Sequence, residues 1–196
     1  MPEHIRFARP EDGEALLEIY APYVRDTAIS FETVPPGPEE FRRRIETVQR
    51  RYPYLVCEDG GRLLGYAYAS PFKGRAAYDW TAETSIYIRR GLHRRGLGRG
   101  LYTALEEVLR AQGVLTMAAC VAAQDGEDSR LTEDSLLFHR AMGFRTVGIF
   151  REAGSKFGRW YHMCLLEKPI GAHIPDPEPI RPVTALPDYG PEHIFL

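Results

Sequence analysis

The sequence predicts one mixed α/β domain in which helices flank a largely antiparallel sheet. Segments with strand and helix periodicity follow one another in the order β-α-α-β-β-β-α-β-α-β-β, and no second domain or internal repeat interrupts them. Between residues 84 and 105 a strand runs through a basic, glycine-rich turn directly into a helix. The 196 residues are 44% hydrophobic and 27% charged, which is typical of a globular domain with a sizeable core.

The first part of the chain contains a short strand and two amphipathic helices. Residues 5–8 have the pattern of a short strand, and a helix with apolar residues three and four positions apart follows Pro10. Residues 27–36 form a loop with one strongly apolar side chain, Phe31. Pro38 then suits the first turn of a second helix.

A hairpin and a third strand precede the glycine-rich turn. Residues 54–58 and 62–69 flank Asp59-Gly60-Gly61, which is a hairpin signal. A loop over residues 71–80 is rich in basic and aromatic side chains, and residues 82–88 form the next strand. We expect the helix after the turn to end at about Gln112.

The remaining chain alternates strands with one short helix and ends in a proline-rich tail. We expect strands at 114–121, 146–152 and 160–166, and a helix over 134–142 that Gly143 terminates. The last 28 residues contain seven prolines, so they predict an extended tail that is draped on the surface, disordered or docked on a neighbouring subunit. The predicted domain is therefore 1–168 and the tail 169–196.

Composition argues against several classes of protein. The formal net charge is −2, whereas a general nucleic-acid-binding protein usually has an excess of positive charge. No apolar run approaches the ~20 residues that cross a membrane, and the polar N-terminus does not resemble a secretory signal. Cys57, Cys120 and Cys164 stand far apart in apolar runs, which predicts buried free thiols in a reducing cytoplasm rather than a metal site.

The turn from His93 to Gly98 has the composition of an anion site. Glycines allow successive backbone N–H groups to point inward, and a helix N-terminus adds roughly half a positive charge. Arginines add charge here, so we predict a phosphate or pyrophosphate ligand; the alternative is a helix start with solvated arginines. A Walker A loop is excluded because Gly-Lys-Ser/Thr is absent, and the glycine spacing does not match the dinucleotide-binding fingerprint.

The same turn resembles the acyl-CoA pyrophosphate motif of the GNAT N-acetyltransferases, (Q/R)-x-x-G-x-(G/A). Further segments resemble the phosphinothricin N-acetyltransferase branch of that superfamily, in order along residues 4–168: 51–56, 77–88, 98–103, 138–144 and 156–160. The resemblance implies the GNAT fold, with a sheet splayed at the acyl-CoA site. It also implies acetyl-CoA as co-substrate without a metal, a small-molecule amine as acceptor, and a homodimer.

The resemblance also implies which residues bind acetyl-CoA. Backbone groups of Ile86, Tyr87 and Ile88 would pair with the pantetheine amides, and one N–H could polarise the thioester carbonyl. Thr132 and Ser135 would add contacts, although relatives often have asparagine at the position of Thr132. The turn would hold the pyrophosphate through His93, where the family has Gln or Arg, and through Arg94, Arg95, Gly96, Leu97, Gly98 and Arg99.

Two residues are candidates for proton transfer. An amine must lose a proton before it attacks a thioester, and Glu83 matches the position of a catalytic glutamate in similar enzymes. The period of two places Glu83 on one face with Ser85 and Tyr87, unless a bulge intervenes; the alternative role is a surface ion pair. His139 matches a position where many relatives carry a tyrosine that protonates the CoA thiolate, so it is either an acid or auxiliary base or a packed helix histidine.

The acceptor pocket is predicted only by analogy. Phe31, Lys73, Arg75 and Tyr78 lie in loops that flank the acceptor site in similar enzymes, and a cation such as Arg75 could hold a carboxylate. The predicted reaction is direct acetyl transfer to an amino-acid-like amine of the phosphinothricin or methionine sulfoximine type. A polyamine or another amine is the alternative acceptor, indicated by the acidic residues between 122 and 131, and a non-catalytic acyl-CoA-binding module is the other alternative.

Overall fold

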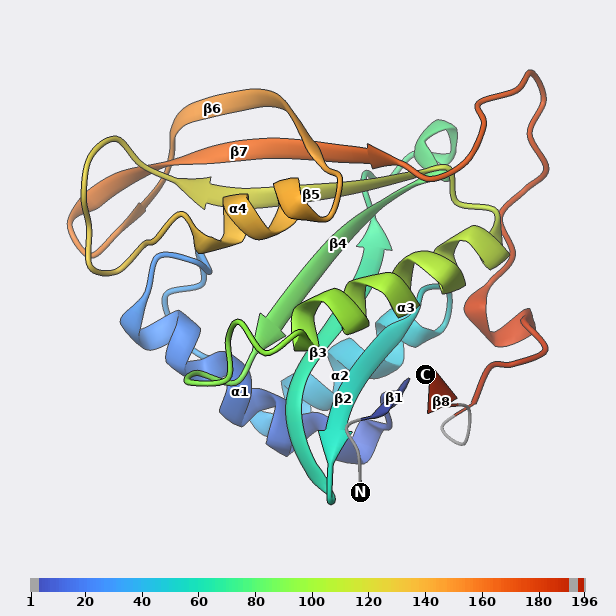
Figure 1. The fold of residues 1–196 in the computed structure, drawn as a ribbon, viewed down its shortest axis with the longest axis horizontal. Coiled ribbons are helices and arrows are strands. Elements are labelled where there is room, and N and C mark those ends of the chain that lie inside the picture. The colour runs from blue at the N-terminus through green and yellow to red at the C-terminus, as the bar shows by residue number, and fades with distance from the viewer. Residues whose placement is uncertain (1–3, 191–193, 196) are drawn as a thin grey trace.

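The computed structural model describes residues 4–190 and 194–195, and its centre is an eight-stranded sheet (Figure 1). The strand order is β6-β7-β5-β4-β3-β2-β1-β8. The strands are β1 (His4–Phe7), β2 (Tyr54–Asp59), β3 (Arg62–Pro71), β4 (Thr81–Ile88), β5 (Thr116–Ala123), β6 (Arg145–Lys156), β7 (Arg159–Pro169) and β8 (Ile194–Phe195). The helices are α1 (Gly13–Asp26), α2 (Pro38–Gln49), α3 (Leu97–Gln112) and α4 (Asp134–Ala141). Among these strand pairs only β4–β5 is parallel, which confirms the predicted mixed, largely antiparallel sheet.

Helices cover both faces of the sheet, α3 on one and the pair α1 and α2 on the other (Figure 1). On α3, Leu101, Leu105 and Leu109 recur every four residues and are fully buried against one side. On β2, Leu55 packs in the cluster under α3, whereas the neighbouring Tyr54 packs in the cluster under α1 and α2. The alternation of strand side chains therefore separates two cores.

Strands β4 and β5 separate part of the way along their length. Their register runs only from Thr81 opposite Thr116 to Glu83 opposite Ala118. β4 continues to Ile88 and β5 to Ala123, and the two strands diverge beyond the paired segment (Figure 1). The predicted splay of the sheet is therefore present, and it opens beside Glu83.

The last two long strands extend further than the sequence predicted. We expected a loop at residues 153–158, but β6 continues to Lys156 and β7 begins at Arg159. The turn between them consists only of Phe157 and Gly158, both with positive φ. Two positive φ values in a row match the twist of a tight hairpin. Irregularities in the register lie next to Gly148 and Gly154, so these glycines mark bulges inside β6 rather than its ends.

The proline-rich tail is extended, and it is also packed against the domain. Its buried residues Ile180 and Val183 join the cluster beneath α3. The Gln112 side chain donates hydrogen bonds to the carbonyls of Arg51 and Arg181, at 2.6 and 2.7 Å. The short strand β8 pairs with β1, so of the three predicted alternatives the described part of the tail follows the draped one.

Candidate active site

Glu83 stands at the point where β4 leaves β5. It is the last β4 residue in register with β5, and it lies opposite Ser70 on β3. The ring of Tyr87 packs against Tyr20 and Tyr23 of α1, with centroids 4.9 and 5.3 Å apart. The β3–β4 register has no irregularity, so the predicted common face of Glu83, Ser85 and Tyr87 points towards α1 and α2.

Cys120 on β5 is the neighbour of Glu83 across the splay. We predicted a core thiol, and for Cys57 and Cys164 that is correct, but Cys120 is exposed. The exposure follows from the geometry, because the strand pairing beside Cys120 has already opened. Part of the Cys120 side chain reaches solvent, but the remainder lines the slot between β4 and β5. This partial desolvation and the hydrogen-bonded carboxylate of Glu83 raise the pKa of Cys120 to about 11, so its thiol is neutral at physiological pH and can donate to Glu83.

A narrow slot of about 50 Å³ lies between the diverging strands. Its walls come from β4, β5 and α4, and they include Ile86, Tyr87, Ser135 and His139 among the predicted site residues. The slot therefore brings together the edge of β4 and the helix α4, from which we expected cofactor contacts, with β5 as its other wall.

The glycine-rich turn lies at the start of α3 and is fixed to the helices on both sides. Gly96 has φ +88°, which an L side chain adopts only with strain, and no atom occupies the space where its Cβ would stand. The His93 ring lies 2.8 Å from the hydroxyl of Tyr23, which donates to the Ile88 carbonyl. Arg94 pairs with Asp134 at the start of α4, at 3.2 Å. Helix-start N–H groups, positive side chains and open space therefore coincide, and the chemistry of the turn fits a pyrophosphate.

Gly98 allows α3 to approach α4 closely. A Cβ at Gly98 would stand 3.1 Å from the ring of Phe138, so a larger residue would press the two helices apart. Leu97 is buried in the core below, whereas Arg95 and Arg99 are on the exposed side of the turn.

His139 is buried, with 3% exposed, and both of its ring nitrogens have partners. Nδ1 lies 2.7 Å from the Ser135 carbonyl, and Nε2 lies 2.9 Å from the hydroxyl of Tyr102. Burial lowers the pKa of His139, which favours a neutral ring that donates from Nδ1 and accepts at Nε2. The Tyr102 hydroxyl is also 3.2 Å from Thr84, which donates to the Ala118 carbonyl, so this chain of contacts ties α4 and α3 to the splay.

The other predicted residues are less closely grouped. Thr132 is exposed and donates to Asp134 at 2.9 Å, immediately before α4. Phe31 packs against Tyr161 and fills the space above Gly154, so it contacts the β6–β7 hairpin.

The three residues of the β3–β4 loop lie at the surface. Lys73, Arg75 and Tyr78 are all exposed. Tyr78 packs on Phe72, and the Lys73 ammonium lies 5.0 Å from the same ring. The charge of Lys73 opposes the rise in the pKa of Cys120, so the Lys73 ammonium lies within electrostatic reach of that thiol.

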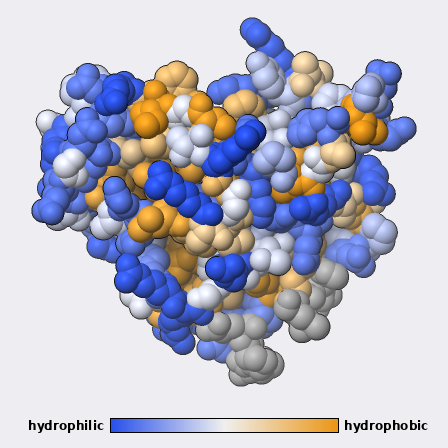
Figure 2. All heavy atoms as spheres, turned by 45° about the horizontal axis from the view of Figure 1, so that its top comes forward, coloured by the Kyte–Doolittle hydropathy of each residue, from blue (hydrophilic) through white to orange (hydrophobic). Residues whose placement is uncertain are grey.

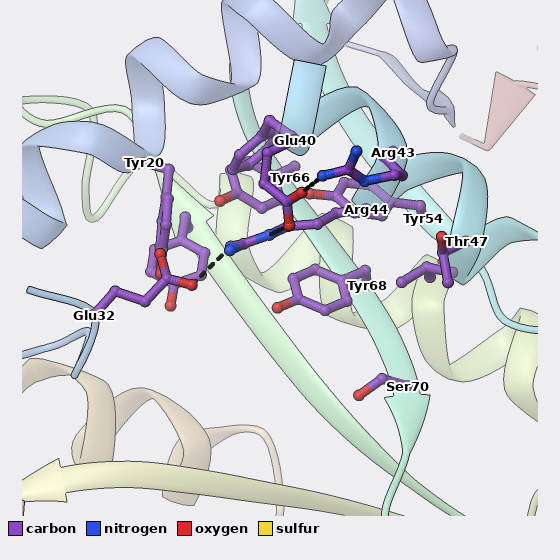
Figure 3. A pocket seen from close by; sticks show the side chains of 13 residues that line it. Tyr20, Glu32, Glu40, Arg43, Arg44, Thr47, Tyr54, Tyr66, Tyr68 and Ser70 are labelled. Carbon is purple, nitrogen blue, oxygen red and sulfur yellow. Dashed lines mark hydrogen bonds and ion pairs between the residues drawn. The ribbon is translucent and has the colours of Figure 1, made fainter. Parts of the chain in front are cut away.

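The sequence reasoning missed a cavity of about 500 Å³ on the α2 side of the sheet (Figure 3). Tyrosines from β2, β3 and β4 line it together with Glu32 and Arg44. Tyr54, Tyr66 and Tyr68 alternate along adjacent strands, so the period of two could have placed them on one face. Their convergence with the 27–37 loop required the tertiary structure.

The described ranges, 4–190 and 194–195, contain neither a candidate metal site nor a candidate membrane span. No group of three or more His, Cys, Asp or Glu side chains there could hold a metal ion. No helix in those ranges is long and apolar enough to cross a membrane.

Comparisons with known proteins agree with this geometry. The family model of the acetyltransferase (GNAT) domain matches residues 5–165. A phosphinothricin N-acetyltransferase of Streptomyces viridochromogenes is 36% identical over 185 residues, covering 94% of this chain and 97% of that protein. An L-methionine sulfoximine/L-methionine sulfone acetyltransferase of Pseudomonas aeruginosa is 31% identical, covering 85% and 94%. The structure of a GNAT phosphinothricin acetyltransferase from Sinorhizobium meliloti, in complex with acetyl-CoA, superposes with a TM-score of 0.79 at 32% identity, covering 87% and 90%. The resemblance found in the sequence is thereby confirmed, and the chain belongs to the GNAT acetyltransferase family.

Proposed function

We propose that this chain transfers the acetyl group of acetyl-CoA to the amino group of a small amino-acid-like acceptor, of the phosphinothricin or methionine sulfoximine type. This acceptor class is supported by two relatives, a phosphinothricin N-acetyltransferase and an L-methionine sulfoximine/L-methionine sulfone acetyltransferase. One observation carries the proposal: Glu83 lies opposite Ser70 of the tyrosine-lined cavity and next to Thr84 of the slot, and Tyr87 lines both. A carboxylate in that position can take a proton from an amine that arrives from the cavity side.

The residues around the slot fit acetyl-CoA, which supplies an activated thioester. Backbone groups of Ile86, Tyr87 and Ile88 line the opened edge of β4 and would hold the pantetheine amides. The pyrophosphate would lie against the turn at residues 93–99, where backbone N–H groups at the start of α3 point outward. Thr132 and Ser135 would border the cofactor from the side of α4.

Glu83 is the proposed base, acting directly or through water. The Cys120 thiol would hold the Glu83 carboxylate in place by donating a hydrogen bond to it. His139 is the second proton-handling candidate. Because its ring is buried and neutral, it would act through the hydroxyl of Tyr102. Phe31, Lys73, Arg75 and Tyr78 would border the approach of the acceptor.

We also propose that the protein is a cytoplasmic homodimer that works without a metal. Free thiols at all three cysteines support a reducing compartment. Four large apolar side chains of the edge strand β6 and of β7 are more than half exposed: Val147, Ile149, Phe150 and Trp160. Figure 2 shows that apolar residues lie among hydrophilic ones on the face drawn there. A second subunit would bury these four side chains.

The polyamine alternative depends on free acidic residues in the 122–131 loop. Asp125 pairs with Arg151 and with His162, at 3.6 and 3.1 Å. Asp128 accepts a hydrogen bond from Tyr161 at 2.7 Å and pairs with Arg159. Asp125 and Asp128 therefore already have cationic or hydroxyl partners, which favours the amino-acid-like acceptor; Glu127, the third acidic residue behind the polyamine alternative, is exposed.

A thiol-release assay with acetyl-CoA and a panel of amines tests the proposal. The panel contains amino acids, phosphinothricin, methionine sulfoximine and polyamines. We expect turnover with amino-acid-like amines and a loss of about 10²- to 10⁴-fold in kcat for Glu83→Gln, with CoA binding unchanged. Glu107→Gln, on the exposed side of α3, is the matched control. Undiminished turnover of Glu83→Gln at saturating substrate would remove Glu83 from its role, and CoA binding without turnover of any amine would favour the non-catalytic module.

A further inference from the structure

Tyr23 of α1 connects the end of β4 to the glycine-rich turn at residues 93–99. Its hydroxyl donates to the carbonyl of Ile88, the last residue of β4, and lies 2.8 Å from Nε2 of His93 in the turn. The Tyr23 side chain is buried, and its ring packs against Tyr87. One buried hydroxyl therefore contacts both the strand and the turn from which we expect contacts with acetyl-CoA (Figure 1).

The Ile88 carbonyl points away from β3. The N–H of Arg89, in the same peptide group, donates to the Leu64 carbonyl at 2.8 Å, so this N–H faces β3. The C=O and N–H of a planar trans peptide point in opposite directions, so the Ile88 carbonyl faces the other edge of β4. The pairing of that edge with β5 ends at Glu83. The carbonyl therefore needs a donor from elsewhere in the fold, and Tyr23 supplies it.

The direction of the contact between Tyr23 and His93 follows from the number of protons. Burial raises the pKa of Tyr23 to about 12, so its hydroxyl is neutral at physiological pH and has a single hydrogen. Because that hydrogen is donated to the Ile88 carbonyl, the Tyr23 oxygen accepts from His93. Nε2 of His93 therefore carries a hydrogen, and the ring joins the turn to Tyr23 as a donor.

The turn needs such an anchor because its backbone is strained beside His93. Arg94 has φ +62°, in the left-handed region that residues other than glycine rarely adopt. Such a conformation persists where the surrounding contacts hold it in place. Asp134 of α4 holds the Arg94 side chain, but both members of that pair are more than half exposed, and exposed ion pairs are weak. The buried hydroxyl of Tyr23 is the firmer anchor, from the side of α1.

We propose that Tyr23 is a positioning residue for acetyl-CoA: its hydroxyl fixes the spacing between the edge of β4, which would hold the pantetheine amides, and the turn, which would hold the pyrophosphate. This inference rests on the proposed function, but only on its first step, the binding of acetyl-CoA. Pantetheine and pyrophosphate belong to one molecule, so both are bound at full strength only when strand and turn are already aligned. Without the hydroxyl, the Ile88 carbonyl and the His93 N–H lose their partner, and CoA has to align the two segments as it binds.

Tyr23→Phe tests the proposal, because it removes the hydroxyl and keeps the ring. We expect the Kd of CoA, measured by calorimetry, and the KM for acetyl-CoA to rise about 5- to 20-fold, with little change in kcat and in the KM for the acceptor. S-acetylpantetheine, which lacks the pyrophosphate, is the matched co-substrate, and its kcat/KM should change by less than about two-fold. Tyr52→Phe is the control, since the buried Tyr52 hydroxyl has no hydrogen-bond partner in the described part of the chain.

Variants of His93 test the direction of the hydrogen bond. His93→Gln keeps an N–H donor, so we expect the Kd of CoA to stay near that of the unchanged protein. His93→Met has a similar length but no donor, and it should raise the Kd about as much as Tyr23→Phe does. In the His93→Met background Tyr23→Phe should add less than it does alone, because the two residues share one contact. Nitrogen-15 NMR of the His93 ring should show a hydrogen on Nε2.

The outcomes separate this inference from the proposed function. An equal loss of kcat/KM for acetyl-CoA and S-acetylpantetheine in Tyr23→Phe, or additive effects of Tyr23→Phe and His93→Met, would refute the positioning role. A hydrogen on Nδ1 alone would mean that Tyr23 donates to His93 and not to Ile88, which overturns the double contact. CoA binding that depends on Tyr23 without turnover of any amine would retain the inference and refute the function. Turnover with an unchanged KM for acetyl-CoA in Tyr23→Phe would retain the function and refute the inference, and a failure of the unchanged protein to bind CoA would overturn both.

Discussion

Val183→Ala tests whether the proline-rich tail belongs to the stable domain. Val183 is fully buried in the cluster beneath α3, and its N–H donates to the Arg51 carbonyl at 3.0 Å. The substitution removes two methyl groups, each worth about 0.8 kcal/mol of transfer free energy, and it leaves a small cavity. We therefore expect the free energy of unfolding to fall by about 1.5–2.5 kcal/mol, which lowers the melting temperature by roughly 4–8 °C in a domain of this size.

Urea denaturation and differential scanning calorimetry measure this change. Val34→Ala is the matched control, because it removes the same atoms from a side chain that is 75% exposed. We expect the control to change the free energy of unfolding by less than about 0.5 kcal/mol. If Val183→Ala were as mild as Val34→Ala, the tail would not be anchored through Val183 in solution, and the reasoning from its burial would be wrong.

Two further predictions concern the turn and His139. Gly96→Ala forces a side chain into a left-handed conformation at an unobstructed position, so we expect a cost of about 1–2 kcal/mol in stability and weaker CoA binding by calorimetry. Gly74→Ala, in a loop position without a positive φ and with free space around its Cβ, should change neither. Burial lowers the pKa of His139 below its ordinary 6.5, so the unfolded chain takes up the proton at a higher pH than the folded chain does. The free energy of unfolding should therefore decline as pH falls below about 6.5, by up to ~1.4 kcal/mol per pH unit. His139→Asn should remove that part of the decline in denaturation curves between pH 7 and 5; an unchanged slope would contradict a neutral, buried His139.

Local sequence patterns predicted much of the fold and the arrangement of several residues of the candidate site. The period of two placed Glu83, Ser85 and Tyr87 on one face, because the direction of a strand side chain follows from its sequence position alone. The glycines of the turn predicted a backbone that curls into the start of a helix, and the positive φ of Gly96 agrees with that prediction, because this conformation depends on the residue itself. Glycines misled the prediction inside β6, where Gly154 marks a bulge and not a loop, since both uses of glycine look alike in sequence.

The sequence by itself determined the GNAT family, the glycine-rich turn before α3 and the position of Glu83 on its strand. Only the tertiary structure decided that Cys120 is exposed beside Glu83, that Val183 is buried, and that Arg44 and Glu32 meet in the tyrosine-lined cavity. Each of these arrangements depends on contacts between segments that lie far apart in the chain. Periodicity and turn chemistry record what a residue does to its own backbone and neighbours, whereas distances between distant segments depend on how the helices and strands pack around shared cores.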